Sequence, residues 1–369
     1  MYLKNIHLLN FKNIRQADVM LNEGLNCLVG NNGAGKTNFL DAVYYLSYCK
    51  SYFNAIDSQL ICHDEDFFVI QGNYERLGQE EAVYAGLKLN QKKQFKRNKK
   101  EYPRLSDHIG LLPLVMISPG DEKLIMEGSD LRRKFLDSVI SQFDKKYLEH
   151  LLRYNRGLNQ RNALLKSAQN GSVNNIQGQL EVWDGQLAGI SFLLYQRRVD
   201  FLKEMEPVFQ KYHTFISGGN DDVRMIYHSH HQKGDLEQQL KDSFEKDRAL
   251  GYTTKGIHRD DLELLLNGYP VKKDGSQGQK KTFFLAMKLA QYEFLQSHCG
   301  FYPILLLDDM FDKLDQTRAS RLIELVSRET FKQIFITDTQ RNRLQNIVEQ
   351  TGKEYTFFKV EKGEVEVAN

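Results

Sequence analysis

The stretch LNCLVGNNGAGKTNFLDAVYYL at residues 25–46 constrains the fold more than any other part of this chain. Its first five residues predict a short buried strand, and a helix is predicted from about Lys36. The run between them, residues 30–37, fits the pattern G-x-x-x-x-G-K-[ST], in which glycines let several backbone N–H groups converge on an anion. A strand, a glycine-rich loop and a helix in this order predict a phosphate-binding loop (P-loop) within an α/β fold.

The residues of this loop have distinct expected roles. The Lys36 ammonium is expected to reach the β- and γ-phosphates of a nucleotide, and the Thr37 hydroxyl to ligate Mg²⁺. The positive end of the helix dipole adds to the attraction for the anion. We therefore predict ATP and Mg²⁺ as cofactors, bound by a continuous set: Gly30, Asn31, Asn32, Gly33, Ala34, Gly35, Lys36, Thr37 and Asn38.

Two carboxylates at the end of a second apolar run complete the predicted metal site. Residues 304–309 read ILLLDD, which is typical of a buried strand that ends at a catalytic edge. We expect Asp308 to hold Mg²⁺ through its water shell and Asp309 to act as the general base for the attacking water. The alternative is a strand capped by a turn of two aspartates. The stretch QIFITDT at 333–339 predicts the next strand of one parallel sheet.

The segment KKDGSQGQKKTFFLAMKLAQYEFL at 272–295 contains a second candidate anion site. Ser276, Gly278 and Gln279 precede an amphipathic helix, whose N-terminus attracts anions. A P-loop, an S-x-G-Q motif and an acidic strand about thirty residues later resemble the order found in ABC-type ATPases. That resemblance implies that Ser276, Gly278 and Gln279 engage the γ-phosphate bound to a second copy of the chain, and gives Ser276 a catalytic role.

The hydrophobic pattern divides the 369 residues into three segments. Strands and turns alternate over residues 1–125, whereas long amphipathic helices are predicted from about 129 to 217, with a break at 167–175. We predict an α/β (α+β) fold: an ABC-type ATPase head with mixed sheets, plus an inserted α-helical domain. The head comprises residues 1–125 and 221–369, and the insert residues 126–220. The closing residues, EYTFFKVEKGEVEVAN, predict an edge hairpin.

Composition bounds the cellular setting. The four cysteines (Cys27, Cys49, Cys62 and Cys299) are scattered without a C-x-x-C pair, which favours reduced thiols in a cytoplasm and argues against structural zinc. The sequence has no apolar run of about twenty residues, so we expect no membrane partner. The formal net charge is only +2, so any nucleic-acid surface must be local.

Five segments in the same order resemble the RecF family of recombination mediators over nearly the full length. They are FKNIRQADVMLNEGLNCLVGNNGAGKTNFLDAVYYL, HIGLLPLVMISPGDEKLIMEGSDLRRKFLD, GIHRDDL, GSQGQKK and LLLDDMFDKLD. The resemblance implies an ATP-dependent homodimer with slow hydrolysis that acts at gapped duplex DNA with RecR and possibly RecO. It also implies a cytoplasmic, nucleoid-associated protein.

The chain departs from related patterns at three places. Gly120 in ISPGD stands where an acidic residue is expected, and Thr337 and Asp338 occupy the neighbourhood where transporter ATPases carry a histidine. The acidic pair is Asp-Asp rather than Asp-Glu. Because the shorter carboxylate lies farther from its water, this change favours a slow switch.

The run KKQFKRNKKEYPR at 92–104 is the strongest local concentration of positive charge. It predicts a hairpin turning near Asn98 that either neutralises DNA phosphates or forms an ordinary solvated turn. The predicted DNA contacts are Lys92, Lys93, Lys96, Arg97, Lys99, Lys100, Arg132 and Arg133. The last two either bind phosphate or, with Lys134, pair with Asp130 and Asp137.

Three further predictions remain open at the level of sequence. Lys12 and Arg15 are candidates for nucleotide contact, whereas His258 and Arg259 either organise the S-x-G-Q region or have a purely structural role. The leading function is a DNA-loading ATPase switch for recombinational repair. The alternatives are a structural DNA clamp related to SMC proteins and a transport ATPase. The clamp lacks support because only about ninety residues form the helical insert, and the transporter because 240 residues separate Lys36 from Ser276.

Overall fold

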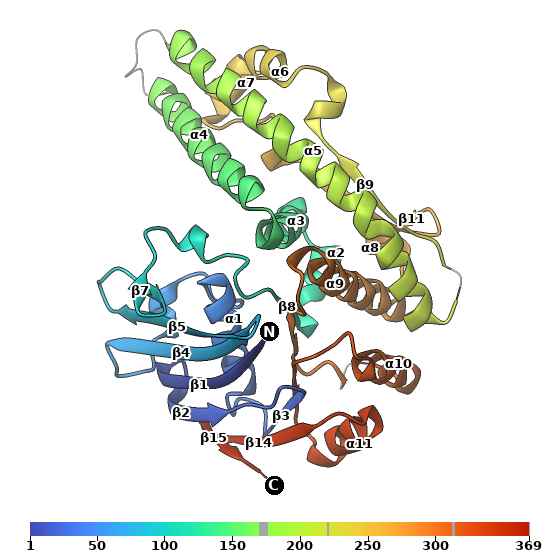
Figure 1. Ribbon diagram of the computed structural model, residues 1–369. Helices are drawn as coiled ribbons and strands as arrows, with labels where there is room; N and C mark the ends of the chain where they lie inside the picture. Colours follow the sequence, from blue (N-terminus) through green and yellow to red (C-terminus); the bar gives the residue numbers. More distant parts are fainter. Residues whose placement is uncertain (170–175, 220, 312–313, 369) are drawn as a thin grey trace. The chain divides into compact units, whose positions relative to one another are not determined.

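The computed structural model describes residues 1–169, 176–219, 221–311 and 314–368 (Figure 1). Contacts between residues divide the chain into two compact units. The first contains Met1–Asp121, Phe215–Gly218 and Phe284–Asn369, and the second contains Glu122–Thr214 and Gly219–Phe283. Among the described residues, no helix combines the length and apolarity that crossing a membrane requires.

One sheet of the first unit is antiparallel throughout. Its six described strands are ordered β2-β1-β4-β5-β6-β7. Alternating burial along β2 and β4 follows from their alternating apolar and polar residues. The strands are β1 (Tyr2–Phe11), β2 (Ile14–Met20), β4 (Phe67–Arg76), β5 (Gln79–Lys88), β6 (Gln94–Arg97) and β7 (Lys100–Glu101).

The second sheet of this unit carries the candidate site. Its six described strands are ordered β15-β14-β3-β13-β12-β8, and all neighbours are parallel except β14 and β15. Four of the strands are buried along their whole length, as expected for parallel strands covered on both faces. They are β3 (Leu25–Val29), β8 (Leu114–Ile117), β12 (Ile304–Leu307) and β13 (Ile334–Asp338); β14 (Tyr355–Glu361) and β15 (Glu364–Val367) complete the sheet.

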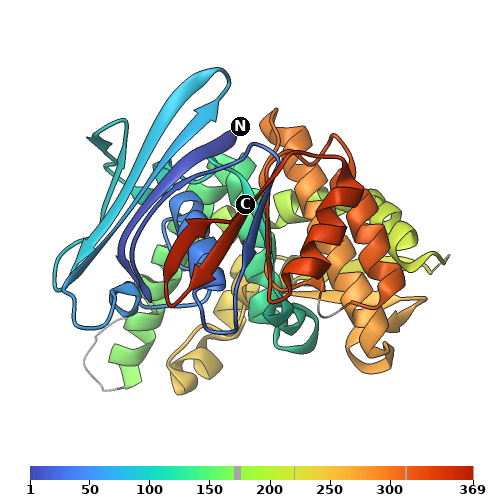
Figure 2. The same ribbon diagram turned by 90° about the horizontal axis from the view of Figure 1, so that it is seen from below.

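Helix α1 (Lys36–Tyr48) lies between these two sheets (Figure 2). Its sequence is apolar on every face, and Phe39, Leu40, Ala42 and Val43 are fully buried in one core. That core also contains residues of β1 and β4 from one sheet and of β3 and β13 from the other. Burial on all sides fixes the N-terminal end of α1, where Lys36 and Thr37 lie. Helices α10 (Gln316–Ser327) and α11 (Arg341–Thr351) pack together in the same unit.

The second unit is mainly helical. Its long helices are α3 (Ser129–Phe143), α4 (Lys145–Gln169) and α5 (Ile176–Ser217), which continues into the first unit. Of the predicted break at 167–175, residues 170–175 lie outside the described residues. A three-stranded sheet, ordered β11-β10-β9, also belongs to the described part of this unit. The smaller elements are α2 (Lys123–Met126), β9 (Val223–His228), α6 (Leu236–Asp242), α7 (Phe244–Leu250), β10 (Asp261–Leu266), β11 (Tyr269–Pro270) and α8 (Val271–Asp274).

The contacts group residues 221–283, which the sequence assigns to the head, with the second unit. These residues pack with the helices because β10 contacts α3 and because polar groups bridge them. Arg161 of α4, fully buried, pairs with Asp247 of α7 at 2.7 Å, and Arg198 of α5 donates to Tyr227 of β9 at 2.9 Å. How these segments divide into independently folding domains stays a prediction.

Candidate nucleotide site

The P-loop connects β3 to α1, as predicted. A Cβ atom on Gly30 would lie 2.1 Å from the carbonyl oxygen of Val360 on β14, so only glycine fits there. Gly33 and Gly35 have φ angles of 78° and 123°, which other residues rarely adopt. These glycines bring the loop close to the sheet and turn its backbone toward the start of α1.

Lys36 is 3% exposed and folds back over the loop. Its Nζ donates to the carbonyl oxygens of Gly30 at 2.9 Å and Asn31 at 3.2 Å. These carbonyl contacts fix the ammonium at the loop, and Asn31, Asn32 and Gly33 beside it are exposed. A phosphate oxygen bound at this loop would offer the ammonium a charged acceptor in place of neutral carbonyls.

Thr37 and Asp308 meet at the carboxyl ends of β3 and β12. The Thr37 hydroxyl lies 2.9 Å from Oδ1 and 3.2 Å from Oδ2 of Asp308. Strand β13 lies between β3 and β12, so Thr337 reaches the same carboxylate. Its hydroxyl donates to Asp308 Oδ1 at 2.9 Å and accepts from the backbone N–H of Asp309, also at 2.9 Å.

The charge of Asp308 is set by opposing effects. Burial raises the pKa of its carboxyl group, while hydrogen bonds from Thr337 and Thr37 lower it. A hydroxyl and a carboxylate at one sheet edge are hard oxygen ligands, which suit Mg²⁺ with retained waters. The residues present therefore fit the predicted metal: Thr37 would ligate it, and Asp308 would hold it through its water shell.

Asp309 is only half-buried and has a φ angle of 45°, which is uncommon for a residue other than glycine. Its backbone N–H is held by Thr337, so the conformation that directs its side chain depends on a residue of the neighbouring strand. Asp338, the second residue predicted near the γ-phosphate, is 1% exposed and pairs with Arg343 at 2.7 Å. Of these two residues, Thr337 is the one that contacts the acidic pair.

Sequence reasoning missed Asn13, which lies after β1. Its Nδ2 donates to the carbonyl oxygen of Ala34 at 3.1 Å, and its Oδ1 accepts from Asn38 at 2.7 Å. The side chain thus ties the P-loop to the first turn of α1. No local motif signals this role. Only the turn between β1 and β2 brings Asn13 to the loop.

Lys12 and Arg15, predicted near the nucleotide, both have carboxylate partners. Lys12 Nζ lies 2.6 Å from Asp41 of α1, and Arg15 lies 3.3 Å from Glu65. Asp41 is fully buried and also accepts from Ser51 at 2.6 Å. Lys12 therefore stabilises α1, and its contact with nucleotide stays a prediction.

The S-x-G-Q motif lies at the N-terminus of α9 (Gln277–Cys299), as predicted. Ser276 Oγ accepts from the backbone N–H of Gln279 at 3.2 Å, and Gln279 Oε1 accepts from the N–H of Ser276 at 2.9 Å. This reciprocal pair is a capping box, which satisfies two backbone donors at the start of the helix. Ser276 is exposed, so a ligand can reach its hydroxyl.

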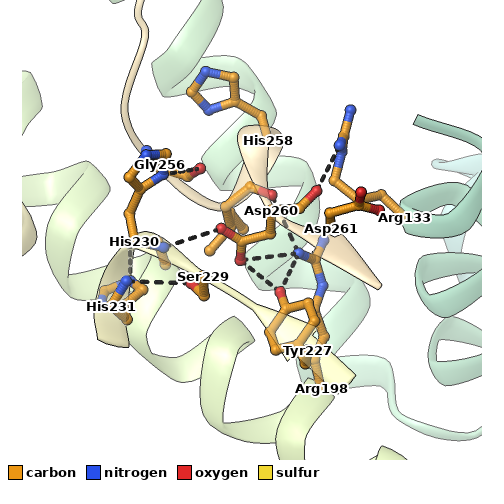
Figure 3. A network of polar contacts seen from close by, with 12 residues as sticks. Arg133, Arg198, Tyr227, Ser229, His230, His231, Gly256, His258, Asp260 and Asp261 are labelled. Atoms are coloured by element: carbon orange, nitrogen blue, oxygen red, sulfur yellow. Dashed lines mark hydrogen bonds and ion pairs between the residues drawn. The ribbon is translucent and has the colours of Figure 1, made fainter. Parts of the chain in front are cut away.

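The GIHRDDL segment forms a buried polar network in the second unit (Figure 3). Asp260, 1% exposed, accepts from Tyr227 at 2.6 Å and lies 3.9 Å from Arg198. His258 contacts the Tyr154 hydroxyl at 2.8 Å and the Thr253 carbonyl oxygen at 3.0 Å, and burial lowers its pKa to about 4. These contacts favour the structural alternative for His258.

The predicted basic hairpin forms, but three cations of the run 92–104 pair with carboxylates of the chain: Lys93, Arg97 and Arg104, the last with Asp107 at 3.2 Å. Strands β6 and β7 pair around Asn98 and Lys99. Arg97 donates through Nε to Glu81 at 2.8 Å, and Lys93 lies 2.6 Å from Asp57. Lys92, Lys99 and Lys100 are exposed, and Lys96 lies over the Tyr84 ring.

Arg132 and Arg133 also bind groups of their own unit. Arg132 forms two hydrogen bonds with Asp261, at 2.7 and 3.0 Å. Arg133 donates to the Asp260 carbonyl oxygen at 2.6 Å. These contacts favour the alternative in which the two arginines pair within the chain. Their partners are Asp261 and the Asp260 carbonyl oxygen, not the predicted Asp130 and Asp137.

Known proteins provide an independent comparison. The sequence matches the model of the RecF/RecN/SMC N terminal domain over residues 2–365. DNA replication and repair protein RecF of Phocaeicola vulgatus is 52% identical over 367 residues, which cover 99% of this chain and 98% of that relative. The chain belongs to the RecF family. The RecF of Flavobacterium johnsoniae is 47% identical over 97% of this chain and 99% of its own.

Solved structures agree with this membership. A structure of the recombination mediator protein RecF with ATP, in the RecFOR pathway, matches with a TM-score of 0.90 and 32% identity, covering 100% of this chain and 98% of that one. An Smc head bound to the C-winged helix domain of ScpA matches with a TM-score of 0.59 at 15% identity, covering 100% and 97%. The predicted ATPase-head fold with a helical insert is thereby confirmed.

Proposed function

We propose that this RecF-family chain is an ATP-dependent DNA-binding protein of recombinational repair. The observation that carries the nucleotide part is the meeting of Thr37 and Asp308 at 2.9 Å beside Lys36. Backbone N–H groups of residues 30–38 and the Lys36 ammonium would hold the phosphates of ATP. Mg²⁺ bound by Thr37 and Asp308 would neutralise charge that develops on the γ-phosphate. Asp309 would then orient and deprotonate the attacking water.

ATP is proposed to join two copies of the chain. Ser276, Gly278 and Gln279 lie at the N-terminus of a 23-residue helix, where backbone N–H groups favour an anion. Their contact with the γ-phosphate on a second copy would make dimerisation depend on ATP rather than ADP. Hydrolysis would be weak and stimulated by DNA, so that it acts as a switch that resets the dimer.

The DNA substrate proposed is a gap or a junction between single-stranded and duplex DNA, where the protein helps to load the recombinase. RecR and possibly RecO are the proposed protein partners, since the similar ATP-bound RecF belongs to the RecFOR pathway. The site of action would be the nucleoid in the cytoplasm. Lys92, Lys96, Lys99 and Lys100 remain candidates for phosphate contact in this proposal.

An SMC-like structural clamp is the alternative, favoured by the shared head fold. SMC clamps need long arms, whereas α5 has 42 residues and reaches about 63 Å at 1.5 Å per residue. The helical insert is therefore too short to enclose DNA as long arms do.

Sedimentation with ATP, ADP or no nucleotide, with and without a gapped duplex, tests the proposal. We expect dimers with ATP but not with ADP or without nucleotide, and we expect the dimer to bind DNA more tightly than the monomer. Lys36→Ala should lose most ATP affinity and, with it, the dimer. Wild-type sedimentation that does not respond to ATP, or equal ATP affinity in Lys36→Ala, would contradict the proposal.

A further inference from the structure

Helix α4 (Lys145–Gln169) carries an unusual excess of positive charge. It contains six of the chain's 50 lysines and arginines but one of its 48 acidic residues, Glu149. The formal net charge of the whole chain is only +2. This helix is therefore a concentrated positive region in a nearly neutral protein, and no motif in the sequence drew attention to it.

One of these cations, Arg161, has a structural role. Arg161 is fully buried and lies with Tyr154 and Leu165 on the face of α4 that packs into the second unit. It donates to Asp184 at 2.6 Å, to Asp247 at 2.7 Å and to Thr253 at 2.9 Å. All of its charge is thus matched inside the protein.

The other five cations of α4 differ from Arg161 in both exposure and pairing. They are exposed, and within the ranges that the structure describes none of them forms an ion pair with a carboxylate. Residues 170–175, which follow the helix, contain no charged side chain in the sequence. The five residues, which we call the α4 basic face, are Lys145, Lys146, Arg153, Arg156 and Lys166.

Helical geometry places these five cations together. At 3.6 residues per turn they fall within about 160° of the helix circumference, opposite the buried face. The exposed residues between them include the neutral Asn159 and Gln160 but also Glu149 and Leu152, so this face carries five positive charges and one negative charge. Arg153 and Arg156 are three positions apart, where like charges repel and destabilise a helix. Glu149, four positions before Arg153, offsets part of this repulsion, and an external anion would relieve the rest.

We propose that the α4 basic face binds the phosphate backbone of duplex DNA. From Lys145 to Lys166 it extends over about 32 Å, close to the roughly 34 Å of one turn of B-DNA. Cations spread along such a length can neutralise successive phosphates, and neutral amides between them can donate to phosphate oxygens. Because contacts with the phosphate backbone carry no sequence information, binding by this face does not depend on sequence. This proposal rests on the proposed DNA-binding function and adds its location.

Anisotropy of a labelled duplex at several salt concentrations tests the proposal on the full chain with Mg²⁺ and ATP. The test variant is Arg153→Gln with Arg156→Gln, which keeps good helix formers on an exposed surface. Each lost phosphate contact lowers the salt slope by about 0.9, so the slope should fall by about 1.8. The affinity at about 0.1 M salt should fall by roughly 60-fold.

Two matched variants control the charge change. Lys203→Gln with Lys246→Gln also removes two exposed cations from the helical unit, but each of these lysines stands beside acidic residues, so near wild-type binding is expected. Arg153→Lys with Arg156→Lys keeps the charge and should restore the slope. Circular dichroism and ATP affinity should be unchanged in all three variants.

The outcomes separate the surface from the function. If Arg153→Gln with Arg156→Gln shows the same salt dependence of duplex affinity as the Lys203 and Lys246 control, the proposal that the α4 basic face binds DNA is overturned. The proposed DNA-binding function would then stand. A wild-type chain that binds no duplex even at low salt would contradict the proposed function as well. Equally tight binding of polyglutamate, lost in the same variant, would show a general anion surface and would overturn the assignment to DNA.

Discussion

Replacing Thr337 by valine is expected to separate nucleotide binding from hydrolysis. The Thr337 hydroxyl is fully buried, donates to Asp308 Oδ1 and accepts from the N–H of Asp309, both at 2.9 Å. Valine keeps nearly the same shape without the hydroxyl. The substitution therefore removes both contacts and leaves the P-loop residues unchanged.

The magnitude follows from the two lost hydrogen bonds. A bond to a charged carboxylate contributes about 1.5–3 kcal/mol, and a buried donor left without its partner costs about 1–3 kcal/mol. We expect the free energy of unfolding to fall by roughly 2–4 kcal/mol. If half of that free energy appears as misplacement of Asp309 in the transition state, turnover falls by about 5- to 30-fold.

Single-turnover hydrolysis, equilibrium ATP binding and urea unfolding measure these effects separately. Thr337→Ser keeps the hydroxyl and should retain most of the turnover. Thr337→Val should show the reduced turnover, while its ATP affinity stays within a few-fold of wild type. Full turnover in a folded Thr337→Val variant would refute the reasoning. So would an equal loss in Thr337→Ser, because that would assign the effect to packing.

Three further predictions concern other parts of the chain. Ser276→Arg should leave ATP binding by the monomer intact but abolish ATP-induced dimers. Mixed with Lys36→Ala it should regain partial hydrolysis, since one composite site then keeps both residues; loss of monomer ATP binding would instead place Ser276 in its own subunit's site. Arg161→Met should lower the free energy of unfolding by about 3–5 kcal/mol by leaving the buried carboxylates of Asp184 and Asp247 without their cation, whereas Arg153→Met on the exposed face of the same helix should change it by about 0.5 kcal/mol or less. Burial lowers the pKa of His108 and of His258 to about 4, so between about pH 6.5 and 4 the unfolded chain binds more protons. The stability that each histidine contributes, on the order of 3 kcal/mol, is therefore present above about pH 6.5 and lost as pH falls through 4. Urea unfolding at several pH values gives the free energy of unfolding as a function of pH. In His108→Gln this free energy should fall less steeply with decreasing pH, and the same pH dependence as wild type would contradict the assignment.

Much of the site could be predicted because its residues are adjacent in sequence to the strands that carry them. The strand at Leu25–Val29 was predicted with its observed bounds, since an apolar run before glycines has few other interpretations. The same holds for Ile304–Leu307 before Asp308. Local pattern therefore sufficed to place the candidate residues that directly follow a buried strand.

Contacts between distant segments could not be predicted in this way. The basic run at 92–104 appeared as one patch, yet Arg97 and Lys93 are matched by Glu81 and Asp57, which no local pattern links to them. Residues 221–283 pack with the helices through buried pairs such as Arg161 and Asp247. The role of Asn13 likewise depends on a turn that brings β1 to the P-loop.

The position of β3 has a consequence for how this protein is made. Its hydrogen-bonded neighbours are β13 and β14, which come from Ile334–Asp338 and Tyr355–Glu361. At about 5–20 residues per second, a ribosome needs roughly 15–60 s to proceed from the P-loop to these strands. Throughout that time the P-loop strand has neither of its partners. A nascent chain, or one truncated before residue 334, therefore contains the complete phosphate-binding motif without the strands that hold it in place, and we expect competence for nucleotide only after residues 334–361 have been made.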